Sequence, residues 1–220
     1  MKKASLRHIG VFSKMSEQSL ESLAHIARFQ CISKDEIVYY EGELLYSAYF
    51  LINGLVELYK MDKNDNELFL CYVDSKNEHN RLINSFSAFK PYEASASVHA
   101  LLDSELVLFD LTQLQELIHH NLEVSNALLY AIIDKGNVFK QFINSKEMYD
   151  SSARVAHLLF TQPKYFNQTQ RQVIARELNI KLETLSRILQ KMLQQNLIAK
   201  NAHGDIYISD MQAFVATFAI

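Results

Sequence analysis

The stretch from Cys31 to Asp110 constrains the fold most, because it holds repeated short β-like segments with no helical pattern between them. The segments are rich in β-branched, aromatic and leucine side chains, and turn-forming residues separate them. They are Ile37–Tyr40, Tyr49–Ile52, Leu55–Tyr59, Leu68–Val73, Ser95–Leu101 and Glu105–Phe109. Short strands that follow one another without crossover helices pair antiparallel, so this stretch predicts a barrel or jelly roll.

The sharpest turn signal in this stretch is Asn53-Gly54. Both residue types tolerate the positive φ angles of a tight turn, and β-rich runs flank them. We therefore expect Tyr49–Ile52 and Leu55–Tyr59 to form a β-hairpin.

After Asp110 the hydrophobic period becomes helical: Leu111–His119 predicts one short helix, and Asn121 caps a longer one. Apolar or small residues recur along the longer helix at spacings of three and four, namely Leu129, Ile132, Gly136, Phe139 and Ile143. This stripe is typical of a coiled-coil seam, and a glycine within it lets a partner helix approach closely. We expect a homodimer through this helix, with packing of the same stripe on the chain's own roll as the alternative.

The final third predicts a winged helix-turn-helix. The order of its elements is a helix over Ala153–Phe160 ended by Pro163, a helix over Gln170–Leu178 capped by Thr169, a turn at Asn179, a helix over Leu182–Gln194, and strands Ile198–Lys200 and Ile206–Ile208 around a loop with Gly204. Asn accepts the left-handed turn geometry more readily than other non-glycine residues.

Charge divides the chain at about the same place. Residues 1–150 hold 14 Lys and Arg against 21 Asp and Glu, a net charge of −7, whereas residues 151–220 hold 8 against 4, a net charge of +4. This distribution indicates that the last third meets a polyanion, with chance drift of surface charge as the alternative.

Two cysteines, Cys31 and Cys71, are too few for a disulfide framework or a four-cysteine metal site within one chain. No apolar run approaches the ~18 residues that span a bilayer, and residues 1–10 lack the apolar core of a signal peptide. We expect a cytoplasmic protein without membrane contact.

Three segments, in the expected order, resemble the Crp/Fnr superfamily of bacterial transcription regulators. Residues 172–189, with Glu183-Thr-Leu-Ser186-Arg187, resemble its helix-turn-helix, 49–59 its β-roll hairpin, and 150–159 the segment after its dimerisation helix. The resemblance implies an α+β fold: an N-terminal double-stranded β-helix (jelly-roll, cNMP-binding-like) sensor domain over 1–120, a long dimerisation helix over 121–147, and a C-terminal winged helix-turn-helix DNA-binding domain over 148–220.

The resemblance implies that the helix starting at Leu182 enters the major groove. There Arg187 can donate to guanine O6 and N7, Glu183 can accept from cytosine N4, and Ser186 can touch a neighbouring base. The alternative is that Glu183 and Arg187 form an i, i+4 pair that only supports a solvated helix.

Leu182 stands at the position where cyclic-AMP receptor proteins carry arginine. In this respect the chain resembles the Fnr branch, which has an apolar residue there. The resemblance therefore implies a palindrome near TTGA-N6-TCAA, with half-sites ~34 Å apart, and RNA polymerase as a further partner. Candidate phosphate contacts are Arg171, Arg176, Lys181, Lys191 and Lys200.

The sensor departs from the family pattern. Members that bind cyclic nucleotides carry Gly-Glu and, about ten residues later, Arg-Ser/Thr-Ala, where this chain has Ile83-Asn84 and Ala94-Ser95-Ala96. Because a buried phosphate without a cationic partner is costly, we expect an effector other than cyclic AMP, or none. A cyclic-nucleotide-responsive regulator with an atypical pocket is the alternative.

By resemblance, an effector would lie between the roll and the long helix, around Ala94, Ser95, Lys135, Phe139 and Lys140. The aromatic residues Phe86, Phe89 and Tyr92 either line this pocket or fill it.

An iron-sulfur cluster of the Fnr type is excluded, since one cysteine precedes the expected hairpin. Haem, nitric oxide or redox sensing stays open, with His79 and His99 as candidate haem ligands. A cupin-like metal enzyme is the remote alternative, but His-x-His is absent, so we expect no enzyme activity and no other metal site.

Overall fold

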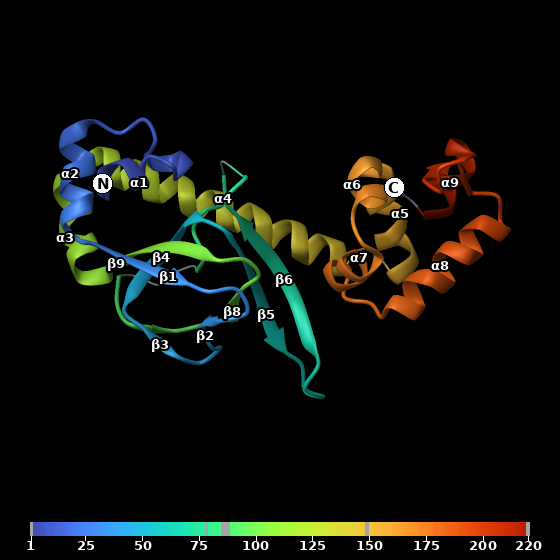
Figure 1. The fold of residues 1–220 in the computed structure, drawn as a ribbon, viewed down its shortest axis with the longest axis horizontal. Helices are drawn as coiled ribbons and strands as arrows, with labels where there is room; N and C mark the ends of the chain where they lie inside the picture. The colour runs from blue at the N-terminus through green and yellow to red at the C-terminus, as the bar shows by residue number, and fades with distance from the viewer. Residues whose placement is uncertain (1, 78, 85–88, 148–149, 219–220) are drawn as a thin grey trace. The chain divides into compact units, whose positions relative to one another are not determined.

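The computed structural model describes residues 2–77, 79–84, 89–147 and 150–218 (Figure 1). It divides into two compact units, Met1–Lys140 and Gln141–Ile220. The division falls inside helix α4 (Leu122–Glu147), so most of the helix expected as a separate segment belongs to the first unit.

The first unit contains two antiparallel sheets. One has the order β1-β9-β4, from Ala27–Ile32, Ser104–Asp110 and Ser47–Asn53. The other has the order β2-β8-β5-β6, from Ile37–Tyr39, Ser97–Ala100, Leu55–Met61 and Glu67–Asp74. A short pair, β3 (Leu44–Leu45) with β7 (Tyr92–Glu93), lies beside them. This arrangement confirms the predicted jelly roll.

The expected hairpin at Asn53-Gly54 is wrong. Strand β4 pairs with β9, whereas β5 pairs with β6 and β8, so the chain crosses from one sheet to the other at this turn. Gly54 has φ +103°, and a Cβ there would lie 2.2 Å from Ser104 Oγ and 2.7 Å from Ser104 Cα. Glycine is required because the turn packs directly against β9.

Two apolar cores hold the first unit together. One joins the sheet β1-β9-β4 to the helices α1 (Lys2–Leu6), α2 (Glu17–His25), α3 (Leu111–His120) and the start of α4. These helices gather at one end of the roll in Figure 1, next to a short 3-10 turn at Gly10–Phe12. The second core fills the roll interior between the two sheets. The predicted cap at Asn121 is confirmed, because its Oδ1 accepts a hydrogen bond from the Val124 amide at 3.1 Å.

The second unit is a winged helix-turn-helix with its own core, as predicted. Its helices are α5 (Ser151–Thr161), α6 (Pro163–Gln168), α7 (Arg171–Glu177), α8 (Leu182–Gln194) and α9 (Met211–Phe218), and its wing pairs β10 (Ile198–Lys200) with β11 (Ile206–Ile208).

The sequence analysis missed α6 and misplaced one cap. Pro163 begins α6 instead of only ending the preceding helix, because proline fits the first helical position, which needs no amide donor. Thr169 ends α6, and α7 begins after Gln170 without a side-chain cap, so the predicted Thr169 cap is wrong. Helix α9, strand β1 before Cys31, and the two-residue strands β3 and β7 were not predicted either.

We expect Gly54→Ala to destabilise the first unit far more than Gly42→Ala. Both glycines have positive φ, +103° and +83°, but a Cβ at Gly42 would meet nothing within 4 Å. The backbone strain alone costs about 1–3 kcal/mol, and the collision with Ser104 adds to it only at Gly54. Urea unfolding of both variants measures the difference. Equal losses would contradict the close approach to β9.

Candidate functional site

Helix α8 presents two opposite faces. Leu185, Ile188, Leu189 and Met192 are buried in the core of the second unit. Glu183, Ser186 and Arg187, the predicted base-reading residues, are all exposed. Spacings of three and four place these three side chains on one face of the helix, as predicted.

The turn before α8 is fixed by Asn179, which has φ +51°. The amide of Ile180 donates to Ala175 O at 3.0 Å, and the amide of Leu185 donates to Lys181 O at 3.0 Å. These bonds end α7 and start α8 within three residues. The left-handed conformation predicted for Asn179 is confirmed.

Glu183 and Arg187 do not pair with each other. Over the part of the chain that the structure describes, neither side chain has a hydrogen-bond or ion-pair partner, and the two are exposed. The alternative of an i, i+4 pair supporting a solvated helix therefore finds no support. Gln190 lies one turn beyond Arg187 and is also exposed. Gln190 is not among the predicted residues, although the sequence shows its i+3 spacing from Arg187 and its amide side chain.

The five candidate phosphate contacts differ in their surroundings. Lys181, Lys191 and Lys200 are exposed. Arg176 is half-buried. Arg171 is half-buried, donates from Nη1 to Phe166 O at 2.6 Å, and stacks with its guanidinium 4.4 Å from the centre of the Phe166 ring. Arg171 therefore stabilises the contact between α6 and α7, which leaves the lysines as the better candidates for phosphate.

Helix α4 leaves an apolar stripe uncovered in this chain. Leu129, Tyr130, Ile132 and Ile133 are 55%, 63%, 42% and 48% exposed, and a Cβ at Gly136 would meet nothing within 4 Å. Phe139, predicted for the same seam, is half-buried and packs against the roll core, so its place in the seam stays a prediction. The side chain of Ile143 lies outside the described residues.

The predicted effector site contains a buried amine. Lys135 of α4 is 1% exposed, with Nζ 3.6 Å from Cys71 Sγ and 5.3 Å from the centre of the Phe139 ring. Burial lowers the pKa of Lys135, and the Cys71 thiol partly offsets this effect. Burial likewise raises the pKa of Cys71, and Lys135 opposes that shift.

The other predicted effector residues do not all join Lys135. Ala94 is buried in the roll core, whereas Ser95 and Lys140 are exposed. Phe89 and Tyr92 pack against the apolar cores, which favours filling over lining, and Phe86 lies outside the described residues.

Arg81 does not replace the missing phosphate-binding arginine. Its guanidinium is buried and donates to the backbone carbonyls of Asn77, Ile52 and Ser75, the first two at 2.6 and 2.9 Å. The side chain ties the loop after β6 to the end of β4.

The two candidate haem ligands do not converge. His79 is exposed and lies 3.6 Å, Nδ1 to Oδ2, from Asp134. His99 alternates along β8 with Val98 and Ala100, which belong to the roll interior, so His99 faces the other side, beside Tyr59. Within the described ranges, no three His, Cys, Asp or Glu side chains come together as metal ligands would.

Two family models match the chain in the order of its two units. A cyclic nucleotide-binding domain matches residues 29–121, and a Crp-like helix-turn-helix domain matches residues 153–216. The chain belongs to the Crp/Fnr superfamily. It is thus a DNA-binding transcription regulator and not an enzyme, and the cupin-like alternative is dropped.

Solved structures of Crp/Fnr-type regulators share the fold at low sequence identity. A CooA mutant from Carboxydothermus hydrogenoformans is 16% identical, with a TM-score of 0.64 over 96% of this chain and 94% of that one. CLP from Xanthomonas campestris, described as a c-di-GMP-responsive global regulator, is 15% identical, with a TM-score of 0.63 over 89% and 100%. FixK2 from Bradyrhizobium japonicum is 18% identical, with a TM-score of 0.60 over 87% and 96%. A search of the curated proteins finds no match.

None of the described helices of this Crp/Fnr-type regulator has both the length and the apolar character that crossing a bilayer requires.

We expect the free energy of unfolding to depend on pH because the pKa of the buried Lys135 amine is lowered. Because its pKa is lowered on folding, the unfolded chain binds more protons than the folded chain between the folded pKa and about 10.5, and stability rises with pH there. We expect Lys135→Met, made in a Cys71→Ala background so that no thiol titrates at this contact, to gain stability over its parent at pH 7. That gain should shrink toward pH 10.

Urea unfolding of parent and variant at pH 7, 8.5 and 10 measures the gain. A difference that does not change with pH would mean that Lys135 keeps its ordinary pKa in the folded protein.

Proposed function

We propose that this Crp/Fnr-type regulator binds an inverted repeat close to TTGA-N6-TCAA as a homodimer, acting in the cytoplasm. The observation that carries the proposal is the exposed face of α8, where Glu183, Ser186 and Arg187 have no protein partners among the described residues. Arg187 would donate two hydrogen bonds to a guanine, Glu183 would accept from a cytosine, and Ser186 would touch a neighbouring base.

The charge of the C-terminal part supports this assignment. Residues 151–220 carry a net charge of +4, and Lys181, Lys191 and Lys200 are exposed around the α8 face and wing. We assign phosphate contacts to these lysines, with Arg176 in addition and Arg171 mainly in a packing role. RNA polymerase is the further partner that this type of regulator implies.

The uncovered stripe of α4 supports the homodimer. A helix stripe with four large apolar residues between 42% and 63% exposed is costly in water, and an identical helix from a second chain would bury it. A palindromic site requires such a two-fold symmetric protein.

For the sensor, we propose an effector other than cyclic AMP, or constitutive binding. The arginine that would hold a cyclic phosphate is absent at Ala94, and Arg81 is occupied by backbone carbonyls. Haem through His79 and His99 is not part of the proposal, because the first is exposed and the second faces away from the roll interior.

Arg187→Ala should weaken binding to a TTGA-N6-TCAA duplex by about 1–3 kcal/mol and leave binding to a scrambled duplex nearly unchanged. Fluorescence anisotropy at stated salt concentrations measures both. Lys191→Ala is the matched control, since loss of a phosphate contact should weaken both duplexes alike and reduce the salt slope by about one. If Arg187→Ala distinguished the two duplexes as well as the wild type does, the base-reading role would be wrong.

Ile133→Asp should convert the dimer into a monomer, because a carboxylate in the α4 stripe would be buried without a partner. Light scattering coupled to size-exclusion chromatography measures the mass. Gln115→Asp, an exposed site on α3, is the control and should remain dimeric. A dimeric Ile133→Asp variant would place the interface elsewhere.

A further inference from the structure

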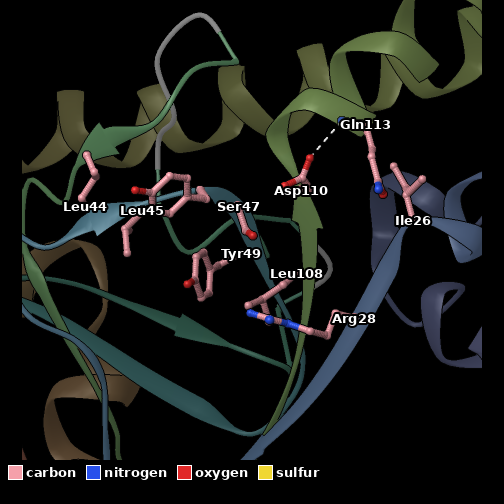
Figure 2. Close-up of a pocket in the computed structure, with 10 residues that line it drawn as sticks. Ile26, Arg28, Leu44, Leu45, Ser47, Tyr49, Leu108, Asp110 and Gln113 are labelled. Atoms are coloured by element: carbon pink, nitrogen blue, oxygen red, sulfur yellow. Dashed lines mark hydrogen bonds between the residues drawn. The ribbon is translucent and has the colours of Figure 1, made fainter.

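A cavity of about 390 Å³ opens at the end of the roll where α3 begins (Figure 2). Its floor is a row of cross-strand neighbours, Arg28 on β1, Leu108 on β9 and Tyr49 on β4. Leu44 and Gln113 line it from β3 and α3. None of the described lining residues comes from α4 or is among those predicted for the effector site, although Leu45, Tyr49 and Leu108 belong to the same roll core. The size of the cavity falls within the range of small-molecule sites.

Among the described residues that line the cavity, one side chain is cationic, that of Arg28. Arg28 is exposed, and over the described residues its guanidinium has neither a hydrogen bond nor an ion pair. Figure 2 shows its side chain extending across Leu108 toward Tyr49. Burial raises the pKa of Tyr49, the charge of Arg28 opposes this shift, and the carboxylate of Glu43, which does not line the cavity, adds to it.

The carboxylate in the cavity does not neutralise Arg28. Asp110 caps α3, and its Oδ1 accepts from the amides of Thr112 and Gln113 at 3.0 and 3.1 Å. Its negative charge therefore stabilises the amino end of α3, where the backbone amides carry a partial positive charge. Over the described residues neither Asp110 nor Glu43 forms an ion pair with Arg28, so its guanidinium remains open to an anion from outside the chain.

The other lining residues indicate which kind of organic group that anion would carry. Leu108 is 1% exposed and forms an apolar floor, while Leu44 is 52% exposed at the rim. A leucine half exposed beside an open cavity gains from burial against an apolar ligand. The exposed amide side chain of Gln113 adds a neutral hydrogen-bonding group.

We propose that this cavity binds a small organic carboxylate with an apolar or aromatic body. The carboxylate pairs with the guanidinium of Arg28, and the body lies against Leu44 and Leu108. Because α3 lines the cavity and leads directly into α4, an occupant would contact the element that precedes the dimerisation helix. This inference goes beyond the proposed DNA binding and does not depend on it.

Isothermal titration calorimetry of the full-length protein with naphthalene-2-carboxylate tests the proposal, with naphthalene-2-carboxamide as the uncharged probe. We expect saturable binding of the carboxylate and at least tenfold weaker binding of the carboxamide, because only the carboxylate pairs with Arg28. Arg28→Met should weaken carboxylate binding at least tenfold. Lys34→Met removes an exposed cation outside the cavity and should bind as the wild type does.

Gln113→Leu gives a second test at an exposed position, should Arg28→Met fail to fold, and it should weaken the carboxylate severalfold. Absence of saturable binding to the wild type, or equal affinities for wild type, Arg28→Met and Gln113→Leu, would overturn the proposal. Equal affinities of carboxylate and carboxamide would also overturn it. Anisotropy with the TTGA-N6-TCAA duplex, run on the same Arg28→Met protein, reports separately on the proposed DNA binding.

Discussion

Helix α4 buries one face against the roll and its covering helices, through Val124, Ala127, Leu128 and Ala131, while the apolar residues of its other face remain exposed. The first face fixes where the helix runs along the roll. Over the described residues the second face stays exposed, and the hydrophobic effect favours its burial by a second copy. The proposed two-fold symmetry, and the palindrome that it would read, both follow from this division of one helix.

Lys135 lies on the roll-facing side of this helix and gives the contact an unusual chemistry. An amine that donates its hydrogen bond to a thiol is costly to bury in its charged form, which is why burial lowers its pKa. The same site also lacks the arginine expected for a cyclic phosphate. The first unit thus keeps the family's fold, and these two features support the proposal of an effector other than cyclic AMP, or of none.

The roll contains a second location with polar side chains, the cavity lined by Arg28 and Asp110. At the cavity beside α3, Asp110 accepts the hydrogen bonds that cap the helix. The guanidinium of Arg28 has no hydrogen-bond or ion-pair partner among the described residues, and the apolar side chain of Leu108 lies next to it. The two locations differ in kind, since Lys135 is enclosed by packing whereas Arg28 faces solvent. The open one is better suited to exchange a ligand without unpacking a core.

Local patterns in the sequence were enough for the recognition helix and the wing. Helix α8 and strands β10 and β11 have the predicted bounds, because periodicity, the Asn179 turn and the Gly204 loop are all properties of neighbouring residues. The change of net charge near residue 150 also follows from the sequence. Glu183, Ser186 and Arg187 were identifiable because helical spacing alone places them opposite the apolar residues of α8.

Tertiary structure decided what depends on residues far apart in the chain. Asn53-Gly54 has the residues of a hairpin, but strand partners were chosen by packing of the turn on Ser104, fifty residues away. Phe139 fits a seam spacing and also packs against the roll core, because a helical stripe does not specify which neighbour covers it. The sequence by itself determined the two-part architecture and the exposed face of α8, since these depend on local period. Only the tertiary structure placed Arg28 beside Tyr49 and Gln113, since strand register and sheet closure bring distant residues together and no local pattern encodes them.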